Sequence, residues 1–263
     1  DLWKYDVSTG YLTWMGGDLG DANLLRRISV GGTKGVAAST NYPGSRFKSN
    51  SWADSNGNFW LFGGNGYLGT NNNNKAGGNL NDLWKYDVLT GYWTWMGGDL
   101  GDASLLDKIA IGGTKGVASS SNYPGGRAYF HTWTDSNGNL WLFGGYGYLG
   151  TSQSQKSGGR LNDLWKYDIS TGYWTWMGGD LGDASLLNRI AIGGTKGVAS
   201  SSNYPGGRSS GHEWTDKDRN FWLFSGDGYM GSSNNNNNKS DGNLNDLWKY
   251  EIDYKPIPTI SST

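Results

Sequence analysis

The sequence DLWKYDISTGYWTWMG at residues 163–178 is the unit on which the chain is organised. It returns almost unchanged at residues 82–97 and 1–16, and a shortened copy begins at Asp246, so that the copies start 81, 81 and 83 residues apart. A long, fixed period means that each repeat is one supersecondary unit, which buries its apolar face against its neighbours. We therefore expect a repeat architecture.

Each period contains four segments with the character of β-strands. After Arg127 the chain reads RAYFHTWTD, the turn SNGN and LWLFGG, and Asn137-Gly138 supplies the positive φ of a tight hairpin. NDLWKYD then alternates apolar and polar residues, and a short turn returns the chain as YWTWMGG. Since no helical apolar stripe separates these segments, we expect an all-β fold of small antiparallel sheets, each one the four-stranded blade of a β-propeller.

The repeats resemble the kelch repeat, the blade unit of galactose-oxidase-like propellers. The resemblance rests on the Gly-Gly that closes the second strand, on DLWKYD, and on the Trp of the fourth strand at Trp14, Trp95 and Trp176. It covers all but roughly the last ten residues, and it is closest to the long-repeat variety of secreted and surface proteins, which implies an extracellular or cell-surface location. The third copy departs from the pattern at Phe224-Ser225-Gly226. We expect that blade to differ at the end of its second strand, because Gly is required where φ is positive.

The predicted kelch propeller segment spans residues 1–252 and holds about three and a half blades. Its parts are a part-blade at 1–17, full blades at 46–98 and 127–179, and a last blade at 208–252 that has only its first three strands. Residues 253–263 contain two Pro without alternation and are predicted to be a linker or tail.

The count of about three and a half blades does not decide whether the ring of blades closes. Closed propellers have roughly four to eight blades, so the ring is completed by further chain or by another copy, or it stays open. An edge strand without a partner favours head-to-tail assembly with other protein chains, including copies of the same chain. A start within a blade and without Met predicts a processed or trimmed N-terminus.

Composition excludes several classes of partner. The formal net charge of −1 and the absence of a basic stripe argue against nucleic acid and against an anionic membrane surface. No run of about 18 apolar residues is present, so we expect no membrane span. With no Cys, the chain has no disulfide and no thiolate nucleophile or ligand.

The sequence predicts no catalytic residues. Galactose oxidase activity, which the resemblance would imply, needs copper ligands and a Tyr crosslinked to a Cys, whereas this chain has two His and no Cys. His131 and His212 occupy equivalent positions where the first repeat has Asn50, which favours packing or hydrogen bonding. A glycosidase would need a pair of carboxylates, but the Asp residues that recur do so in every blade, whereas catalytic residues occur once. A fragment of a galactose-oxidase-like or glycosidase-like enzyme whose site lies elsewhere remains an alternative.

Tyrosines and carboxylates in two long connections are the candidate binding residues. We expect residues 146–160 and 180–207 to form long loops on one rim, where ordered loops are usually functional. The first kind of loop carries candidate ligand-binding tyrosines, which would suit a lectin-like site for glycans: Tyr67, Tyr146, Tyr148 and Tyr229.

The blade-to-blade loops repeat the sequence GGDLGDASLL. Its carboxylates are candidate Ca²⁺ ligands, at Asp99, Asp102, Asp180 and Asp183, with Asp18 and Asp21 as the first copy. The structural interpretation is favoured: Asp102 is an N-cap for a short helical turn that packs Leu105 and Leu106 against the blades. No cofactor is therefore assigned, with Ca²⁺ as the alternative.

Two further repeated residues are interpreted as structural. Arg46, Arg127 and Arg208 could clamp a carboxylate ligand, but a hydrogen bond across to carbonyls of the neighbouring blade or to the Asp of DLWKYD is favoured. The repeated tryptophans are interpreted as packing between blades and not as sugar platforms: Trp84, Trp165 and Trp248. The sequence thus favours a noncatalytic scaffold for protein association, with carbohydrate binding as the second hypothesis.

Overall fold

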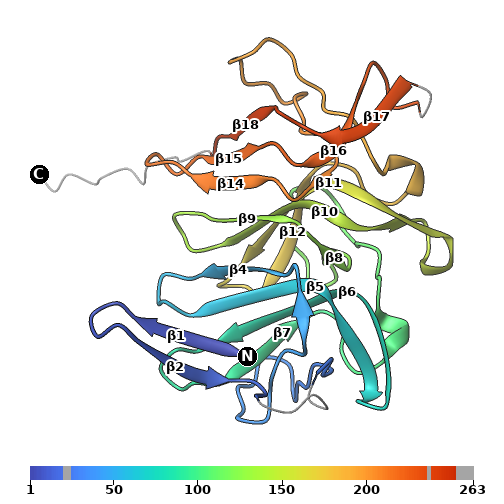
Figure 1. The fold of residues 1–263 in the computed structure, drawn as a ribbon. Coiled ribbons are helices and arrows are strands. Elements are labelled where there is room, and N and C mark those ends of the chain that lie inside the picture. The colour runs from blue at the N-terminus through green and yellow to red at the C-terminus, as the bar shows by residue number, and fades with distance from the viewer. Residues whose placement is uncertain (20–24, 236–237, 253–263) are drawn as a thin grey trace, which may run out of the picture.

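The computed structural model describes residues 1–19, 25–235 and 238–252. It is all-β with antiparallel sheets, none of them closed, which confirms the predicted fold class at that level (Figure 1). The predicted tail at 253–263 and Asp21 lie outside the described residues. In the part of the chain that the structure describes, no helix is long and apolar enough to cross a membrane.

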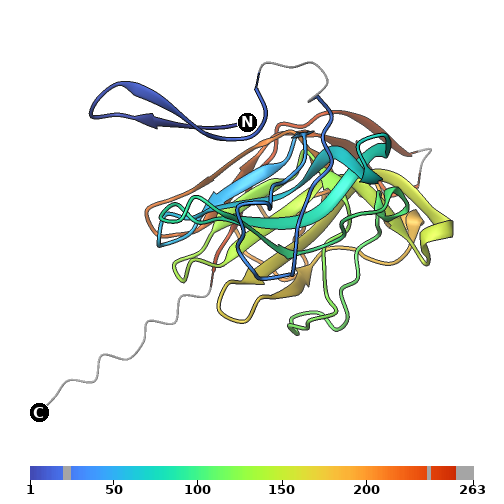
Figure 2. The same ribbon diagram turned by 90° about the horizontal axis from the view of Figure 1, so that it is seen from below.

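The N-terminus forms a two-stranded hairpin of β1 (Leu2–Asp6) and β2 (Tyr11–Gly16). Trp3 pairs with Trp14, and Lys4 pairs with Thr13. Figure 2 shows this hairpin set apart from the stacked sheets that follow. It corresponds to the third and fourth strands of a repeat that here has no first or second strand among the described residues.

Two repeat units, at residues 46–98 and 127–179, each fold into a five-stranded sheet. The strands of the first are β3 (Arg46–Phe47), β4 (Asn50–Ala53), β5 (Phe59–Asn71), β6 (Asn74–Tyr86) and β7 (Trp93–Gly97). Those of the second are β8 (Arg127–Ala128), β9 (His131–Thr134), β10 (Leu140–Gly150), β11 (Lys156–Asp168) and β12 (Tyr173–Gly178). The order β12-β11-β10-β9 is the predicted order of four strands, with β8 as an additional short strand on β10.

The predicted first strand is thus broken in two in every repeat. Between its halves lies a non-glycine residue in the left-handed region: Lys48 at φ 57°, Tyr129 at 61° and Ser210 at 60°. These residues also join the repeats, since the N–H of Tyr129 donates to the carbonyl of Lys48 and the N–H of Ser210 donates to the carbonyl of Tyr129, each at 3.1 Å. Non-glycine residues persist in this conformation only where the surroundings hold them there.

The prediction of a long loop at residues 146–160 is wrong, because most of these residues lie in strands. β10 runs on to Gly150 and β11 begins at Lys156, so only a short turn with the 3₁₀ segment η3 (Gln153–Gln155) connects them. In the YGYLG sequence of this arm Tyr146 and Tyr148 alternate with Gly147 and Leu149, which is a strand period, and Gly147 pairs with Gly159 across the ladder. The glycines allow two backbones to approach closely there and do not mark a loop.

The third repeat, at residues 208–252, is divided into two three-stranded sheets. One contains β13 (Arg208–Ser209), β16 (Asp227–Gly231) and β17 (Lys239–Asn243), and the other contains β14 (His212–Thr215), β15 (Phe221–Phe224) and β18 (Leu247–Tyr250). The break falls at Ser225-Gly226, where the sequence departs from Gly-Gly, and Ser225 has φ 65°. The expected difference at the end of the second strand is present.

The connections before the first and second repeats pack along the outer strand of the repeat that follows. Ala38 forms an isolated bridge with Trp93 of β7, and Ser119 does so with Trp174 of β12. Two of the connections contain short 3₁₀ segments, η2 (Ala103–Leu105) before the second repeat and η4 (Ala184–Leu186) before the third. Leu106 after η2 is buried against Leu68 and Leu80. The sheets are held together by a core of large rings and leucines, which includes Phe62, Trp165 and Trp174.

Candidate ligand-binding site

The repeated arginines lie inside their own repeats, where their guanidinium groups donate hydrogen bonds to carboxylate and carbonyl oxygens of the protein. Arg127 binds both carboxylate oxygens of Asp163 at 2.6 Å and also donates to the carbonyls of Gly144 and Gly125. Trp165 Nε1 donates to the same carboxylate at 2.7 Å. The predicted Arg–Asp bonds also join Arg46 to Asp82 and Arg208 to Asp246. Since Arg127 and Asp163 are completely buried, this cluster is a structural element of the sheet and offers nothing to a ligand.

The repeated tryptophans lie where packing requires them. Trp84 and Trp165 have no exposed surface. Trp248 is partly buried against the cluster that contains Trp141 and Phe221. Trp84 and Trp165 therefore present no open ring face on which a sugar could stack.

The candidate calcium ligands are also engaged. Asp99 accepts a hydrogen bond of 2.8 Å from Asn81, and Asp180 accepts one of 2.9 Å from Asn162. Asp102 and Asp183 each cap a 3₁₀ turn by accepting from a Ser backbone N–H, and this bond lowers the pKa of both carboxyls. The described residues contain no group of three or more His, Cys, Asp and Glu side chains that could hold a metal ion.

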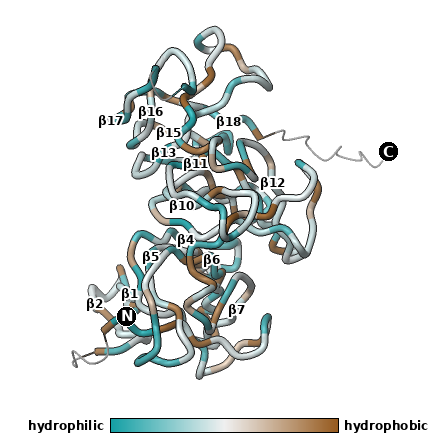
Figure 3. Tube along the Cα trace, turned by 90° about the vertical axis from the view of Figure 1, so that its right-hand side faces the viewer, coloured by the Kyte–Doolittle hydropathy of each residue, from teal (hydrophilic) through white to brown (hydrophobic). Residues whose placement is uncertain are grey.

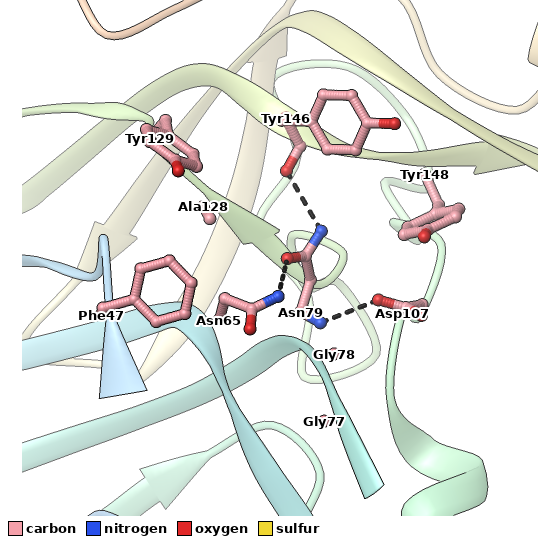
Figure 4. Close-up of a pocket in the computed structure, with 10 residues that line it drawn as sticks. All are labelled: Phe47, Asn65, Gly77, Gly78, Asn79, Asp107, Ala128, Tyr129, Tyr146 and Tyr148. Carbon is pink, nitrogen blue, oxygen red and sulfur yellow. Dashed lines mark hydrogen bonds between the residues drawn. The ribbon is translucent and has the colours of Figure 1, made fainter. Parts of the chain in front are cut away.

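Two of the four candidate tyrosines meet at one cavity. Tyr146 and Tyr148, both on β10, line a hollow of about 350 Å³ between the first two repeats (Figure 4). Tyr67 and Tyr229 both lie at the strand position equivalent to that of Tyr148, and neither lines this hollow. Tyr229 instead lies between Arg160 and Lys239, whose charged groups are 5.2 and 5.1 Å from its ring centroid.

The cavity has aromatic walls and a polar floor. Phe47 and Tyr129 complete the aromatic lining. At the floor Asn79 donates to the carbonyl of Tyr146 at 3.4 Å, and its backbone N–H donates to Asp107 at 2.8 Å (Figure 4). Burial, with the nearby carboxylate of Asp107, raises the pKa of Tyr148. Tyr148 is therefore a neutral hydrogen-bonding group at neutral pH.

A second cavity of about 310 Å³ adjoins the first and shares Tyr129 with it. It is lined by residues at which the three repeats differ: Lys48, Asn50, His131 and Glu213. His131, in the second repeat, is buried, and its Nδ1 lies 3.0 Å from Oε2 of Glu213 in the third repeat. Its Nε2 is buried without a hydrogen-bond partner.

Sequence reasoning assigned His131 to packing or hydrogen bonding and did not single out Glu213. His131 forms such a bond, whereas His212 at the equivalent position is exposed. The signal that could have found this pair is divergence within a strict repeat, since Glu213 stands where the other copies have Ser51 and Thr132.

Comparison with known proteins adds little to this geometry. No family model matches the chain, and no curated protein matches it. The solved structure of YjhT is similar to this chain at 16% sequence identity, over 81% of this chain and 70% of that one, with a TM-score of 0.37. A likeness at this level carries no argument about function.

Proposed function

We propose that this chain is a noncatalytic segment of a kelch-type β-propeller, extracellular or at the cell surface, that acts as a scaffold for protein association. The kelch assignment is supported by the repeated sequence pattern, and the location is supported by its resemblance to secreted and surface kelch proteins. Its partners are other protein chains, including copies of itself.

The observation that carries the proposal is that the repeat at each end of the described part of the chain lacks one or more of its four strands there. β6 and β11 each carry a fourth strand, whereas β18 pairs only with β15 among the described strands. At the other end the hairpin β1–β2 exposes Trp3, Tyr5 and Trp14. Strand edges and exposed aromatic rings are the features by which extended segments of other chains are bound.

Sedimentation velocity tests the proposal across a wide range of concentration. We expect the weight-average mass to rise with concentration, because an interface built from a strand edge is small. A chain that stays monomeric throughout, alone and in the presence of a lysate of surface proteins, would contradict a role in association.

A second candidate function, the binding of glycans, is favoured by the cavity at Tyr146. Its aromatic rings offer apolar faces to a sugar ring, while Asn65, Asn79 and Asp107 offer donors and acceptors for hydroxyl groups. A glycan array with the native chain and a Tyr146→Ala variant tests it. We expect signals that Tyr146→Ala removes and that Tyr67→Ala, outside the cavity at the strand position equivalent to that of Tyr148, retains. An array without signals would rule this candidate out.

A further inference from the structure

The connections before the two complete repeats hold the fourth strand by a fixed set of donors. The backbone N–H of Gly35 donates to the carbonyl of Trp95, and that of Gly116 donates to the carbonyl of Trp176, both at 2.8 Å. Side-chain amides add a second bond: Asn41 donates to the carbonyl of Trp93 at 3.0 Å, and Asn122 donates to that of Trp174 at 3.1 Å. The fourth strand is thus held from both sides, by the third strand and by the connection.

The connection before the third repeat has the same local fold. Val198 donates to the carbonyl of Thr195, and Asn203 Nδ2 donates to the carbonyl of Val198 at 3.1 Å, as in the other copies. The bridge between Ile192 and Tyr204 is also conserved among the three connections of this chain. The donors at Gly197 and Asn203 are therefore in position, although no fourth strand lies between them and β18 in the described part of the chain.

The space for a strand is present as well as the donors. A Cβ at Gly31 or Gly112 would lie 3.0–3.1 Å from Cβ of the fourth-strand Trp, Trp95 or Trp176. At Gly193, the equivalent position in the third connection, only the Trp248 ring comes within 4 Å. The third repeat therefore holds a preformed seat for a strand, formed by β18 on one side and by the connection around Gly197 on the other.

β2 has the sequence and conformation that fit this seat. It reads YLTWMG, where the fourth strand β12 reads YWTWMG. Trp14 Nε1 donates to the carbonyl of Gly16 at 2.8 Å, as Trp176 donates to Gly178 at 2.6 Å. Leu12 is 65% exposed and Trp14 is 48% exposed, and these are the residues whose equivalents supply the carbonyls that the connections bind.

We propose that β2 of a second copy leaves its own β1 and pairs with β18, so that it completes the third repeat as its fourth strand. A second copy is required because the hairpin and the third repeat lie at opposite ends of the stack (Figures 1 and 3). Exchange of β2 costs little, since an isolated two-stranded hairpin is marginally stable in water. The register places Thr13 opposite Lys249, as Thr94 lies opposite Lys85 and Thr175 opposite Lys166.

This inference rests on the proposed function and specifies its contact. The contact is modest: one short strand with two aromatic rings buries on the order of a few hundred Å², below the roughly 800 Å² per partner of a standard stable interface. Assembly through this contact is therefore expected to depend on concentration.

Cysteine cross-linking between two different variants tests the contact, and the chain has no native Cys to interfere. A Thr13→Cys variant is mixed with a Lys249→Cys variant under mild oxidation, because opposed residues of paired strands are close enough for a disulfide. The matched control mixes Thr13→Cys with Lys166→Cys, whose strand edge is already filled by β12. We expect about tenfold more cross-linked heterodimer in the first mixture, since pairing raises the effective concentration of the two thiols.

The other outcomes distinguish a failure of the strand exchange from a failure of the proposed scaffold function. Association in sedimentation without this cross-link would overturn the strand exchange and leave the scaffold function in place. A monomeric chain at all concentrations would overturn both. A third sample is a chain that carries both Thr13→Cys and Lys249→Cys. A cross-link that forms only within this single chain, and not between two chains, would overturn the second copy as the occupant.

Discussion

The second and third repeats share their Arg–Asp pair and the tryptophan of their first strand but bury these residues differently. Trp133 in the second repeat is 6% exposed, whereas Trp214 at the equivalent position is 44% exposed. Both repeats nevertheless form the same Arg–Asp–Trp cluster with the same short bonds. The cluster is therefore a local product of each repeat, whereas the burial is supplied by the repeat that follows. Stability in such a chain depends on neighbours as well as on sequence.

The largest difference between the two repeats is expected on removal of the arginine. Arg127→Ala leaves the Asp163 carboxylate buried without its partner, which costs roughly 3–5 kcal/mol. Arg208→Ala should cost about 1–3 kcal/mol, because the Asp246 side chain is 29% exposed and water replaces part of what is lost. Urea unfolding of both variants and the native chain gives the two free energies.

A conservative control distinguishes the loss of charge from the loss of the forked geometry. Arg127→Lys keeps the charge but cannot bind both carboxylate oxygens as a planar fork, so we expect an intermediate loss. Equal losses for Arg127→Ala and Arg208→Ala would show that burial by the next repeat does not set the strength of the cluster.

A smaller difference is expected at the asparagines of the connections. Asn122→Ala removes the bonds to the carbonyls of Val117 and Trp174, and it should destabilise the chain by about 1–2 kcal/mol, since each lost bond contributes about 1 kcal/mol and the Trp174 carbonyl keeps only the longer bond from the Ser119 N–H. Asn203→Ala should cost less in dilute solution, since the bond to a fourth strand is not made within one copy. Unfolding at rising protein concentration sharpens the comparison: the cost of Asn203→Ala should grow if a second copy fills the seat. A cost that stays constant would argue against that occupant.

The sequence predicted features that depend on residues close together in one repeat. The Arg–Asp bonds, the N-cap at Asp102 and the irregularity at Ser225 all follow from the local pattern and its departures. The extended arms of β10 and β11 were missed, because Gly is permissive and only its partner across the ladder decides between loop and strand. The His131–Glu213 pair was missed because the two residues are 82 positions apart, on different repeats.

Acid should destabilise the chain through carboxylates that accept hydrogen bonds. Trp222 and Asn220 donate to Asp216 and lower its pKa from 3.8 to about 2. The unfolded state then binds more protons than the folded state between pH 4 and pH 2, so stability contributed by Asp216 is present above pH 4 and is lost as the pH falls to 2. Urea midpoints measured at steps across this window should decline, and the decline should be shallower in Asp216→Asn. Parallel profiles for the two proteins would contradict the assignment to Asp216.

The smallest difference is expected at the two aspartate caps, which serve as an internal control on the comparison. Asp102 and Asp183 accept from Ser104 and Ser185 at 2.8 and 2.7 Å, and both lie in connections that have a complete repeat before them. Replacement of either by Ala should lower the free energy of unfolding slightly, because the Ser backbone N–H loses its acceptor. Because a cap acts within its own turn, the two losses should agree within error in urea unfolding, even though the repeat that follows Asp102 has its fourth strand and the repeat that follows Asp183 has none among the described residues. A clearly smaller loss at Asp183 would mean that the missing fourth strand loosens the whole connection, and the seat around Gly197 would then be formed on binding instead of in advance.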